Sequence, residues 1–332
     1  MWTFIEHAEQ GRGHIANSVP CQDKTYSIEK NGVSAIALAD GAGSAKLSHY
    51  GADAVCKSVC EYFCDNFDDI YENENAKEIS ENLINHMLTC LNTLVEELAC
   101  DIKDLSSTIL TVATKDDKYI LAHCGDGVMG YMKNDELKVA SRPANGEFAN
   151  QTFFVTSRNV SSALRLAKGQ LNGIRAFVAI SDGSEASLYS KSGNYFAKAI
   201  EKIINNATYV PVVKVKQGVS DLFKNAIIKK TTDDCSIAII LRRDSSTSKY
   251  HSLSFEEKCE IFSINHTLNN SKYTLHRAEV LIQALQSPIS IDDLTVKVGI
   301  KTVSYLKKRL ENLLENNLVK KDEEMYSSLL CI

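Results

Sequence analysis

The segment IALADGAGSAKLSHYGA, residues 36–52, combines a buried strand, a carboxylate and a run of very small side chains. An apolar run ends at Asp40, and Gly41, Ala42 and Gly43 follow before a helical pattern begins. A single Asp-Gly pair is common in turns, so this segment alone does not identify a functional site. The same arrangement at other strand ends would indicate that several carboxylates act together.

Short apolar strands surround this segment. Residues 25–40 are predicted to form a hairpin, because two apolar runs flank Lys30-Asn31-Gly32 and Asn-Gly is typical of tight β-turns. Helices are predicted from about 48 to 66 and from about 76 to 100, where apolar residues recur at helical spacing. The strands that follow, over residues 106–140, are separated by three short polar turns, which predicts one antiparallel meander.

Further along the chain, two more apolar strands carry aspartates at one end. FVAISDG (177–183) ends in Asp182, and TTDDCSIAIILRR (231–243) begins with Asp233 and Asp234. The segment between the meander and these strands, residues 141–172, is polar and irregular, which predicts a surface flap.

The acidic residues at the strand ends form the candidate site. Strands that converge at one end of a sheet would bring their carboxylates together, and crowded carboxylates repel one another. A hard divalent cation removes that cost, and an all-oxygen ligand set favours Mg²⁺ or Mn²⁺ over zinc. The small residues after Asp40 would let backbone carbonyls and water reach the same ion. The set comprises Asp23, Asp40, Asp126, Asp182 and either Asp233 or Asp234.

Composition excludes several other classes of protein. The 332 residues carry a formal net charge of -5, which gives no basic signature for nucleic acid. The first residues lack a signal-peptide pattern and no apolar run reaches membrane length, so we expect a cytoplasmic protein without a membrane partner. Ten cysteines in such a chain should be reduced thiols. Three of them, Cys56, Cys60 and Cys64, are predicted to be small buried side chains on one helix face rather than metal ligands.

The composition changes after Arg243. A Ser-rich stretch predicts a linker over residues 244–272, between a first domain at 1–243 and a small domain at 273–332. The small domain shows three helical patterns and a short hairpin, an order typical of winged helices. It holds eight basic and eight acidic residues, so DNA binding is disfavoured and a docking or regulatory role is preferred.

Six segments, taken in order, resemble the motifs of the metal-dependent protein phosphatases of the PP2C type, the PPM family. The resemblance covers about residues 1–243, and ANQTFFVT (149–156) also resembles the flap of bacterial members. It implies an α+β fold, an αββα sandwich of two antiparallel sheets flanked by helices. It also implies a phosphoric monoester hydrolase that acts on phosphoserine and phosphothreonine in proteins. A cognate kinase is a candidate partner of the small domain. The six segments are PCQD (20–23), ADGAGSAKLSHYGA (39–52), SST (106–108), HCGDGVMGY (123–131), SDG (181–183) and DDCS (233–236).

The resemblance also assigns roles to individual residues. Asp40 would bridge two Mn²⁺ or Mg²⁺ ions, and the Gly41 carbonyl would bind one of them. Asp182 and Asp233 would hold the other ion, with Asp234 as the alternative ligand, and Asp126 with Asp182 would hold a third, weaker ion. Asp23 would hold metal-bound waters, so Asp40 and Asp23 are the predicted catalytic residues. A water between two ions about 3.5–4 Å apart would then attack phosphorus in line.

The chain departs from the family pattern just before Asp23. Many members carry Glu and Arg where this sequence has Gln22 and Ser18, so Arg12 or His14 is the candidate phosphate-binding group. These departures leave two alternatives open: a weak or inactive phosphatase-like sensor or scaffold, and a DNA-binding regulator that acts through the small domain. The complete set of aspartates favours the enzyme.

Overall fold

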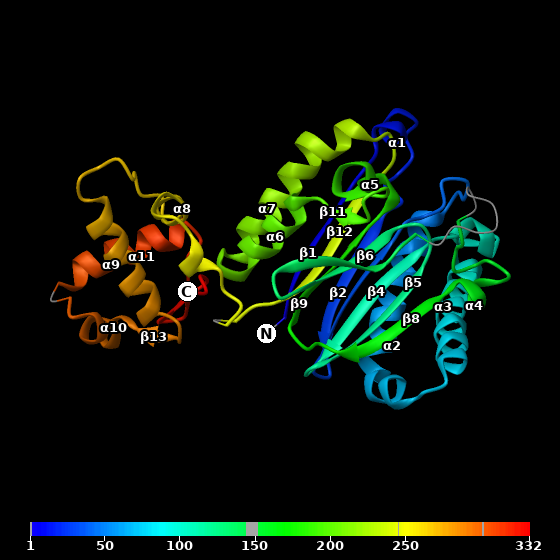
Figure 1. Ribbon diagram of the computed structural model, residues 1–332, viewed down its shortest axis with the longest axis horizontal. Coiled ribbons are helices and arrows are strands. Elements are labelled where there is room, and N and C mark those ends of the chain that lie inside the picture. The colour runs from blue at the N-terminus through cyan, green and yellow to red at the C-terminus, as the bar shows by residue number, and fades with distance from the viewer. Residues whose placement is uncertain (1, 144–151, 245, 301) are drawn as a thin grey trace. The chain divides into compact units, whose positions relative to one another are not determined.

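Two five-stranded sheets organise the larger part of the chain (Figure 1). The computed structural model describes residues 2–143, 152–244, 246–300 and 302–332, and its larger unit comprises residues 2–201 and 219–241. The first sheet has the order β1 (Trp2–Glu9), β12 (Cys235–Arg242), β9 (Ile174–Ile180), β6 (Val128–Lys133) and β7 (Glu136–Ser141). The second sheet has the order β2 (Lys24–Lys30), β3 (Val33–Ala39), β4 (Ile109–Lys115), β5 (Lys118–Cys124) and β8 (Arg165–Gln170).

A continuous apolar core fills the space between the two sheets. Ile36 and Leu38 of β3 belong to it together with Phe177 of β9 and Ile240 of β12. Because side chains alternate along a strand, the residues between them point to the opposite face. On β3 those residues are alanines, which belong to the cluster formed with α2. The VSAIALA strand is therefore buried on both faces, with its large side chains between the sheets.

Two long helices, α2 (Ser48–Glu72) and α3 (Ala76–Leu98), cover the other face of the second sheet (Figure 1). Cys56, Cys60 and Cys64 of α2 are buried there, and their Sγ atoms lie 3.5 to 3.9 Å from backbone carbonyls of β2 and β3. The prediction of small buried thiols is confirmed. Helix α2 has a non-helical residue at Asn66, where the first predicted helix ended, and then continues to its last residue.

Helical residues also pack on the free face of the first sheet. Trp2 and Phe4 of β1 contact the core between the sheets, so Ile5 and His7 point the other way. The His7 ring meets the ring of Phe223 with their centroids 5.1 Å apart. Shorter elements of this unit are α1 (Arg12–Ala16), η1 (Ile102–Leu105), α4 (Val160–Ala163), α5 (Asp182–Leu188), β10 (Tyr189–Ser190), β11 (Tyr195–Phe196), η2 (Phe223–Ile227) and η3 (Ile228–Lys230).

The predicted hairpin at residues 25–40 is confirmed, but the predicted meander is wrong as a single sheet. Asn31 and Gly32 both have positive φ in the turn between β2 and β3. Strands β4 and β5 pair in the second sheet, whereas β6 and β7 pair in the first. Gly125-Asp126-Gly127 is therefore a crossing between sheets, not a hairpin turn. A run of short apolar strands looks the same in sequence whether neighbours pair or face each other across a core.

The predicted irregular flap at 141–172 also contains a strand. β8 pairs antiparallel with β5 at the edge of the second sheet. Its sequence, RLAKGQ, is polar because four of its six side chains are exposed, and this hid the strand pattern. Residues 144–151, which include the first three residues of the predicted flap motif ANQTFFVT, lie outside the described residues.

The smaller unit comprises residues 202–218 and 242–332. Its three-stranded sheet has the order β13-β15-β14, and the predicted three helices and hairpin are present in its C-terminal part. The predicted linker at 244–272 is partly helical and contributes Tyr250, Cys259 and Phe262 to the core of this unit. Its serines act as caps and turn residues, as where Ser254 caps α8, and this gave the stretch the composition of a linker. The elements are η4 (Tyr250–Ser252), α8 (Phe255–Ile261), α9 (Ser271–Ala284), β13 (Ile289–Ser290), α10 (Ile291–Val298), α11 (Val303–Glu315), β14 (Val319–Asp322) and β15 (Met325–Ser328).

Helices α6 (Lys198–Tyr209) and α7 (Val212–Leu222) each contribute residues to both units. The division therefore differs from the predicted boundary at 243. Across the described ranges, no helix combines the length and apolar character needed to cross a membrane.

Candidate metal centre

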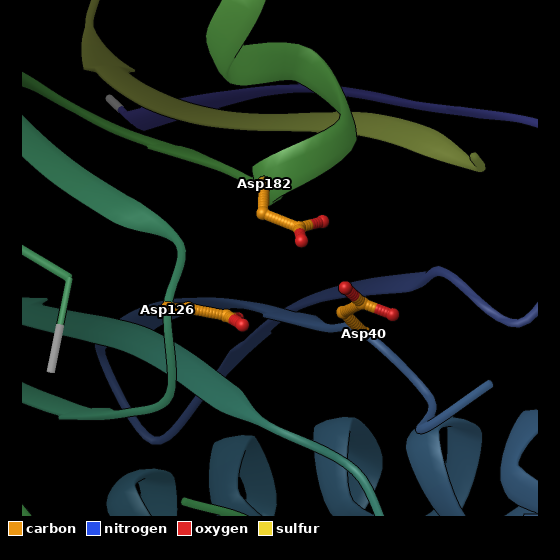
Figure 2. Close-up of side chains that lie close together, drawn as sticks. All are labelled: Asp40, Asp126 and Asp182. Carbon is orange, nitrogen blue, oxygen red and sulfur yellow. The ribbon is translucent and has the colours of Figure 1, made fainter. Parts of the chain in front are cut away.

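Three aspartates converge in the larger unit (Figure 2). Asp40 follows β3, Asp126 lies on the crossing from β5 to β6, and Asp182 follows β9 at the start of α5. Each offers a carboxylate oxygen, and these oxygens lie within 4.8 Å of one another. The two sheets thus bring together carboxylates that are separated by up to 142 residues in the sequence.

Backbone hydrogen bonds fix the position of Asp40. Its N–H donates to the Thr108 hydroxyl at 2.8 Å, and the Thr108 N–H donates to the Asp40 carbonyl at 2.8 Å. A Cβ on the next residue, Gly41, would lie 2.8 Å from the Ser48 side chain at the start of α2. Gly41 is therefore needed so that the chain can turn closely past the helix.

Asp126 is held by a residue of the predicted flap. The Thr152 hydroxyl donates to the Asp126 carboxylate at 2.5 Å. Three residues later, the Val155 N–H donates to the Ser107 carbonyl at 2.9 Å, beside the strand that holds Asp40. The described part of the ANQTFFVT segment thus connects two of the three aspartates, a role that its sequence did not reveal.

Asp182 is positioned by close packing of α5 against the start of β12. A Cβ on Gly183 would lie only 1.9 Å from the Asp234 carbonyl oxygen, so only glycine fits. The Ser184 hydroxyl donates to the Ser236 carbonyl at 2.9 Å and closes the same contact. The SDG and DDCS segments are therefore packed together.

The neighbouring residues Asp233 and Asp234 have different surroundings. Asp234 is buried, and its carboxylate accepts the N–H groups of Gly11 at 2.6 Å and Gln22 at 2.5 Å. The Asp233 side chain is 55 % exposed, and its charge helps to raise the pKa of both Asp40 and Asp182. The Asp234 carboxylate thus connects two distant loops to the start of β12. The preference for Asp233 as the metal ligand remains a prediction.

Asp23 is a buried acid without an ordinary partner. It is 1 % exposed, and neither carboxylate oxygen accepts a hydrogen bond of normal geometry from the described residues. Burial raises the pKa of Asp23 to about 7, although the Ser236 and Ser181 hydroxyls lie close enough to lower it in part. Buried polar atoms in native proteins almost always have a partner, so these oxygens indicate ordered water or a cation.

The electrostatics of the cluster favour a cation. Part of the Asp40 surface is accessible, yet the surrounding protein removes enough water to raise the pKa of Asp40 well above its usual range. The charges of Asp23, Asp182, Asp126 and Asp233 raise it further. Burial also raises the pKa of Asp182. Carboxylates crowded in this way are the ligand set of a hard divalent ion, so the residues present fit Mg²⁺ or Mn²⁺.

The two predicted phosphate-binding residues contact the DDCS segment and the residues just before it. The exposed Arg12 donates from Nε to the Thr231 carbonyl at 3.1 Å. His14 Nδ1 lies 2.9 Å from the Asp234 carboxylate, and its Nε2 lies 4.0 Å from Asp233. These positions do not test whether either residue binds phosphate, so both assignments remain predictions. Gln22 is buried, and its side-chain oxygen has no partner among the residues described.

An ion pair that the sequence did not predict lies beside the cluster. Glu185, one turn after Asp182 on α5, is buried and pairs with Lys191 at 2.5 Å. The Lys191 side chain is 70 % exposed, and the charges of Asp182 and Asp126 help to raise its pKa after the larger effect of Glu185. The three-residue spacing from Asp182 could have revealed Glu185, whereas no sequence signal marks Lys191.

Two antiparallel sheets gather carboxylates at their strand ends, and this arrangement is a candidate site for divalent cations. Residues 10–217 match the family model for protein phosphatase 2C, and the chain belongs to that family of serine/threonine phosphatases. The chain is 23 % identical over 183 residues to serine/threonine-protein phosphatase 3 of Escherichia coli K12. That match covers 53 % of this chain and 72 % of the relative.

Solved structures of bacterial phosphatases share the fold at low identity. A bacterial serine phosphatase is matched with a TM-score of 0.52 and 14 % identity, over 74 % of this chain and 99 % of that one. Stp1 from Staphylococcus aureus gives a TM-score of 0.51 and 13 % identity, over 73 % and 96 %. The catalytic domain of PstP, solved with two manganese ions, gives 0.50 and 14 %, over 73 % and 99 %. The expected α+β fold of two antiparallel sheets with helices is confirmed.

Proposed function

We propose that this protein is a Mg²⁺- or Mn²⁺-dependent phosphatase that hydrolyses phosphoserine and phosphothreonine in proteins. The convergence of Asp40, Asp126 and Asp182 within 4.8 Å is the observation that carries the proposal. Membership of the protein phosphatase 2C family supports the same reaction, and the E. coli relative is by its name a serine/threonine-protein phosphatase.

The aspartates would divide the work of holding two ions and a third, weaker one. Asp40 would contact two ions, with the Gly41 carbonyl on one and Asp182 and Asp233 on the other. Asp126 would complete the third site with Asp182. Divalent ions, when bound, lower the pKa of a coordinated water towards neutrality and offset charge on the phosphoryl oxygens.

The remaining residues would position water and phosphate. Asp23 offers two buried oxygens without an ordinary partner, which would accept hydrogen bonds from water in the site. Arg12 and His14 would bind the phosphate group, because no arginine stands at position 18. Cys21 is the nearest thiol in sequence, but burial and the charges of Asp234 and Asp23 raise its pKa, so it stays protonated and is a poor nucleophile.

We also propose that the C-terminal part of the smaller unit is a winged-helix-like accessory module. Its elements follow the order helix, strand, helix, helix, strand, strand, from α9 to β15, which supports this interpretation. Its balanced charge disfavours nucleic acid, so a docking or regulatory role, for a cognate kinase or for self-association, is preferred. Tight, steeply salt-dependent binding to duplex DNA would contradict this part of the proposal.

A peptide assay tests the proposed reaction. The full chain is incubated with a phosphothreonine peptide in manganese or in chelator, as wild type, Asp40→Asn and Asp53→Asn. Asp53 is an exposed aspartate of α2 paired with Lys57, so its variant is a matched control. We expect manganese-dependent release of phosphate that falls at least a hundredfold in Asp40→Asn and is unchanged in Asp53→Asn. Manganese binding without turnover would instead support the sensor or scaffold.

A further inference from the structure

The smaller unit contains a hollow of about 310 Å³, lined by α9, α11 and the segments that precede them. These helices lie close together in this unit (Figure 1). Its floor is apolar, and its members are Phe262, Leu281, Val298, Ile300 and Leu313. The volume lies at the lower end of the range for small-molecule sites, about 300–1,000 Å³.

Two arginines line the hollow and share one aromatic ring. The guanidinium carbons of Arg277 and Arg309 lie 5.1 Å and 5.2 Å from the ring centroid of Tyr305. Arg309 Nε also donates to the Tyr305 hydroxyl at 3.0 Å, and Arg277 donates to the Tyr273 hydroxyl at 3.2 Å. These contacts hold both side chains in place at low cost in conformational freedom.

Neither guanidinium forms an ion pair with a carboxylate among the residues that the structure describes. Several lysines of the larger unit do pair with a carboxylate, as Lys57 does with Asp53. Arginine presents a planar set of N–H donors that matches an oxyanion, and most of that set is unused here. Tyr273, beside them, is 63 % exposed although it lines the same hollow.

We propose that this hollow is a binding site for a small organic anion. The apolar floor would take a ring-sized hydrocarbon body, and Arg277 with Arg309 would hold an attached carboxylate, phosphate or sulfonate. Both arginines line the same hollow, so both would act on an anionic group bound there. A macromolecular ligand is less well matched, because a volume of about 310 Å³ fits a single ring system and the basic charge of the module is balanced by acid.

Calorimetric titration of the full chain in chelator tests the site with defined probes. The probes are 2-naphthalenesulfonate and 2-naphthol, which share a ring system and differ in charge. Chelator keeps the anion from any metal centre, so the result is independent of the proposed phosphatase activity. We expect the sulfonate to bind at least tenfold more tightly than the alcohol, and to lose at least tenfold in affinity in the Arg277→Gln/Arg309→Gln variant.

A matched control and a local probe complete the test. Lys308→Gln removes one positive charge from the same helix at a residue that does not line the hollow, and it should leave binding unchanged. Methyl NMR should show sulfonate-induced shifts at Val280, Val298 and Ile300, which all line the hollow. If the double variant does not fold, the two single variants are measured in its place.

Several results would overturn the proposal. Equal affinity for the alcohol would remove the role of the arginines. The absence of binding at about 5 mM sulfonate, roughly five times the dissociation constant of a millimolar site, would remove the site. If Lys308→Gln lost as much affinity as the arginine variants, the effect would come from the overall charge of the module and not from the two arginines. Methyl shifts confined to other residues would place the anion elsewhere.

Discussion

The carboxyl group of Asp23 is buried. Neither of its oxygens accepts a hydrogen bond of normal geometry from the described residues. Its raised pKa, about 7, follows mainly from burial. Asp234, a buried aspartate at the same end of the sheets, accepts two backbone N–H groups instead. Two residues of one type therefore differ in chemistry because only one has its hydrogen bonds satisfied by the protein.

The Asp23 pKa predicts a pH-dependent stability in the absence of metal. The folded-state pKa lies above the unfolded value of 3.8, so the folded protein binds the extra proton between about pH 4 and 7. The stabilising contribution of that proton is present at low pH and lost as pH rises through 7. Relative to Asp23→Asn, wild type in chelator should lose up to a few kcal/mol, by order of magnitude, between pH 5 and 8.

Urea unfolding of both proteins at the two pH values measures this difference. His123, whose pKa burial lowers to about 3, changes stability in the opposite direction, but it is common to both proteins and cancels. A constant difference between wild type and variant from pH 5 to 8 would show that Asp23 does not titrate in this range.

Lys191 leads to a prediction about substrate binding. It is a largely exposed cation close enough to Asp182 and Asp126 for their charges to act on it. We expect Lys191→Gln to raise KM for a phosphopeptide about threefold to tenfold with little change in kcat, because an exposed charge contributes modestly to binding. Lys138→Gln, which removes a lysine paired with Glu136 on β7, is the control. An unchanged KM in Lys191→Gln would show that the lysine does not contribute to substrate binding and has only a structural role in the β10–β11 hairpin.

The aspartates at strand ends could be predicted from sequence because each follows or precedes a strong apolar run. Thr152, which holds Asp126, and Lys191, which pairs with the neighbouring Glu185, could not be predicted, since both lie on segments without an apolar pattern. Asp233 and Asp234 are adjacent, and only their three-dimensional neighbours distinguish the exposed carboxylate from the buried one.

At the scale of the elements, the short connections between the two sheets build the site. Hairpins and long helices were predictable from Asn-Gly turns and helical spacing, because those signals are local. The assignment of strands to sheets was not, since β5 and β6 are consecutive but belong to different sheets. The same crossing carries Asp126 to the other two aspartates, so the part of the topology that the sequence hid is the part that forms the site.

Packing of α5 against β12 predicts a severe effect of one added methyl group. Gly183→Ala would place a Cβ 1.9 Å from the Asp234 carbonyl oxygen, which must then move. We expect a loss of about 1–3 kcal/mol or more in stability and weaker manganese binding, because Asp182 and Asp233 would be displaced from each other. Thermal melting with and without manganese measures both effects.

Gly218→Ala on α7 is the matched control for that variant. No atom lies within 4 Å of its added Cβ, so it should be neutral or slightly stabilising, as alanine favours the helix. If Gly183→Ala behaved like Gly218→Ala, the contact between α5 and β12 would not constrain the site.

At the scale of the whole molecule, the family match over residues 10–217 and the two sheets belong to the part of the chain in which the sequence motifs occur. Beyond it, the Ser-rich composition at 244–272 suggested a linker, whereas Tyr250 and Cys259 from that stretch are core residues of the smaller unit. Composition reports the average polarity of a segment, and it misses single buried side chains in a helix of 7 residues.

The central claim is that the crowded aspartates form a divalent metal centre, and titration of manganese into the chelator-treated full chain tests it most directly. The account predicts at least two bound ions per chain, a melting temperature that rises with the excess of manganese over its dissociation constant, and loss of both effects in Asp40→Asn. Failure of wild type to bind manganese at millimolar concentration, or binding that Asp40→Asn leaves intact, would contradict it.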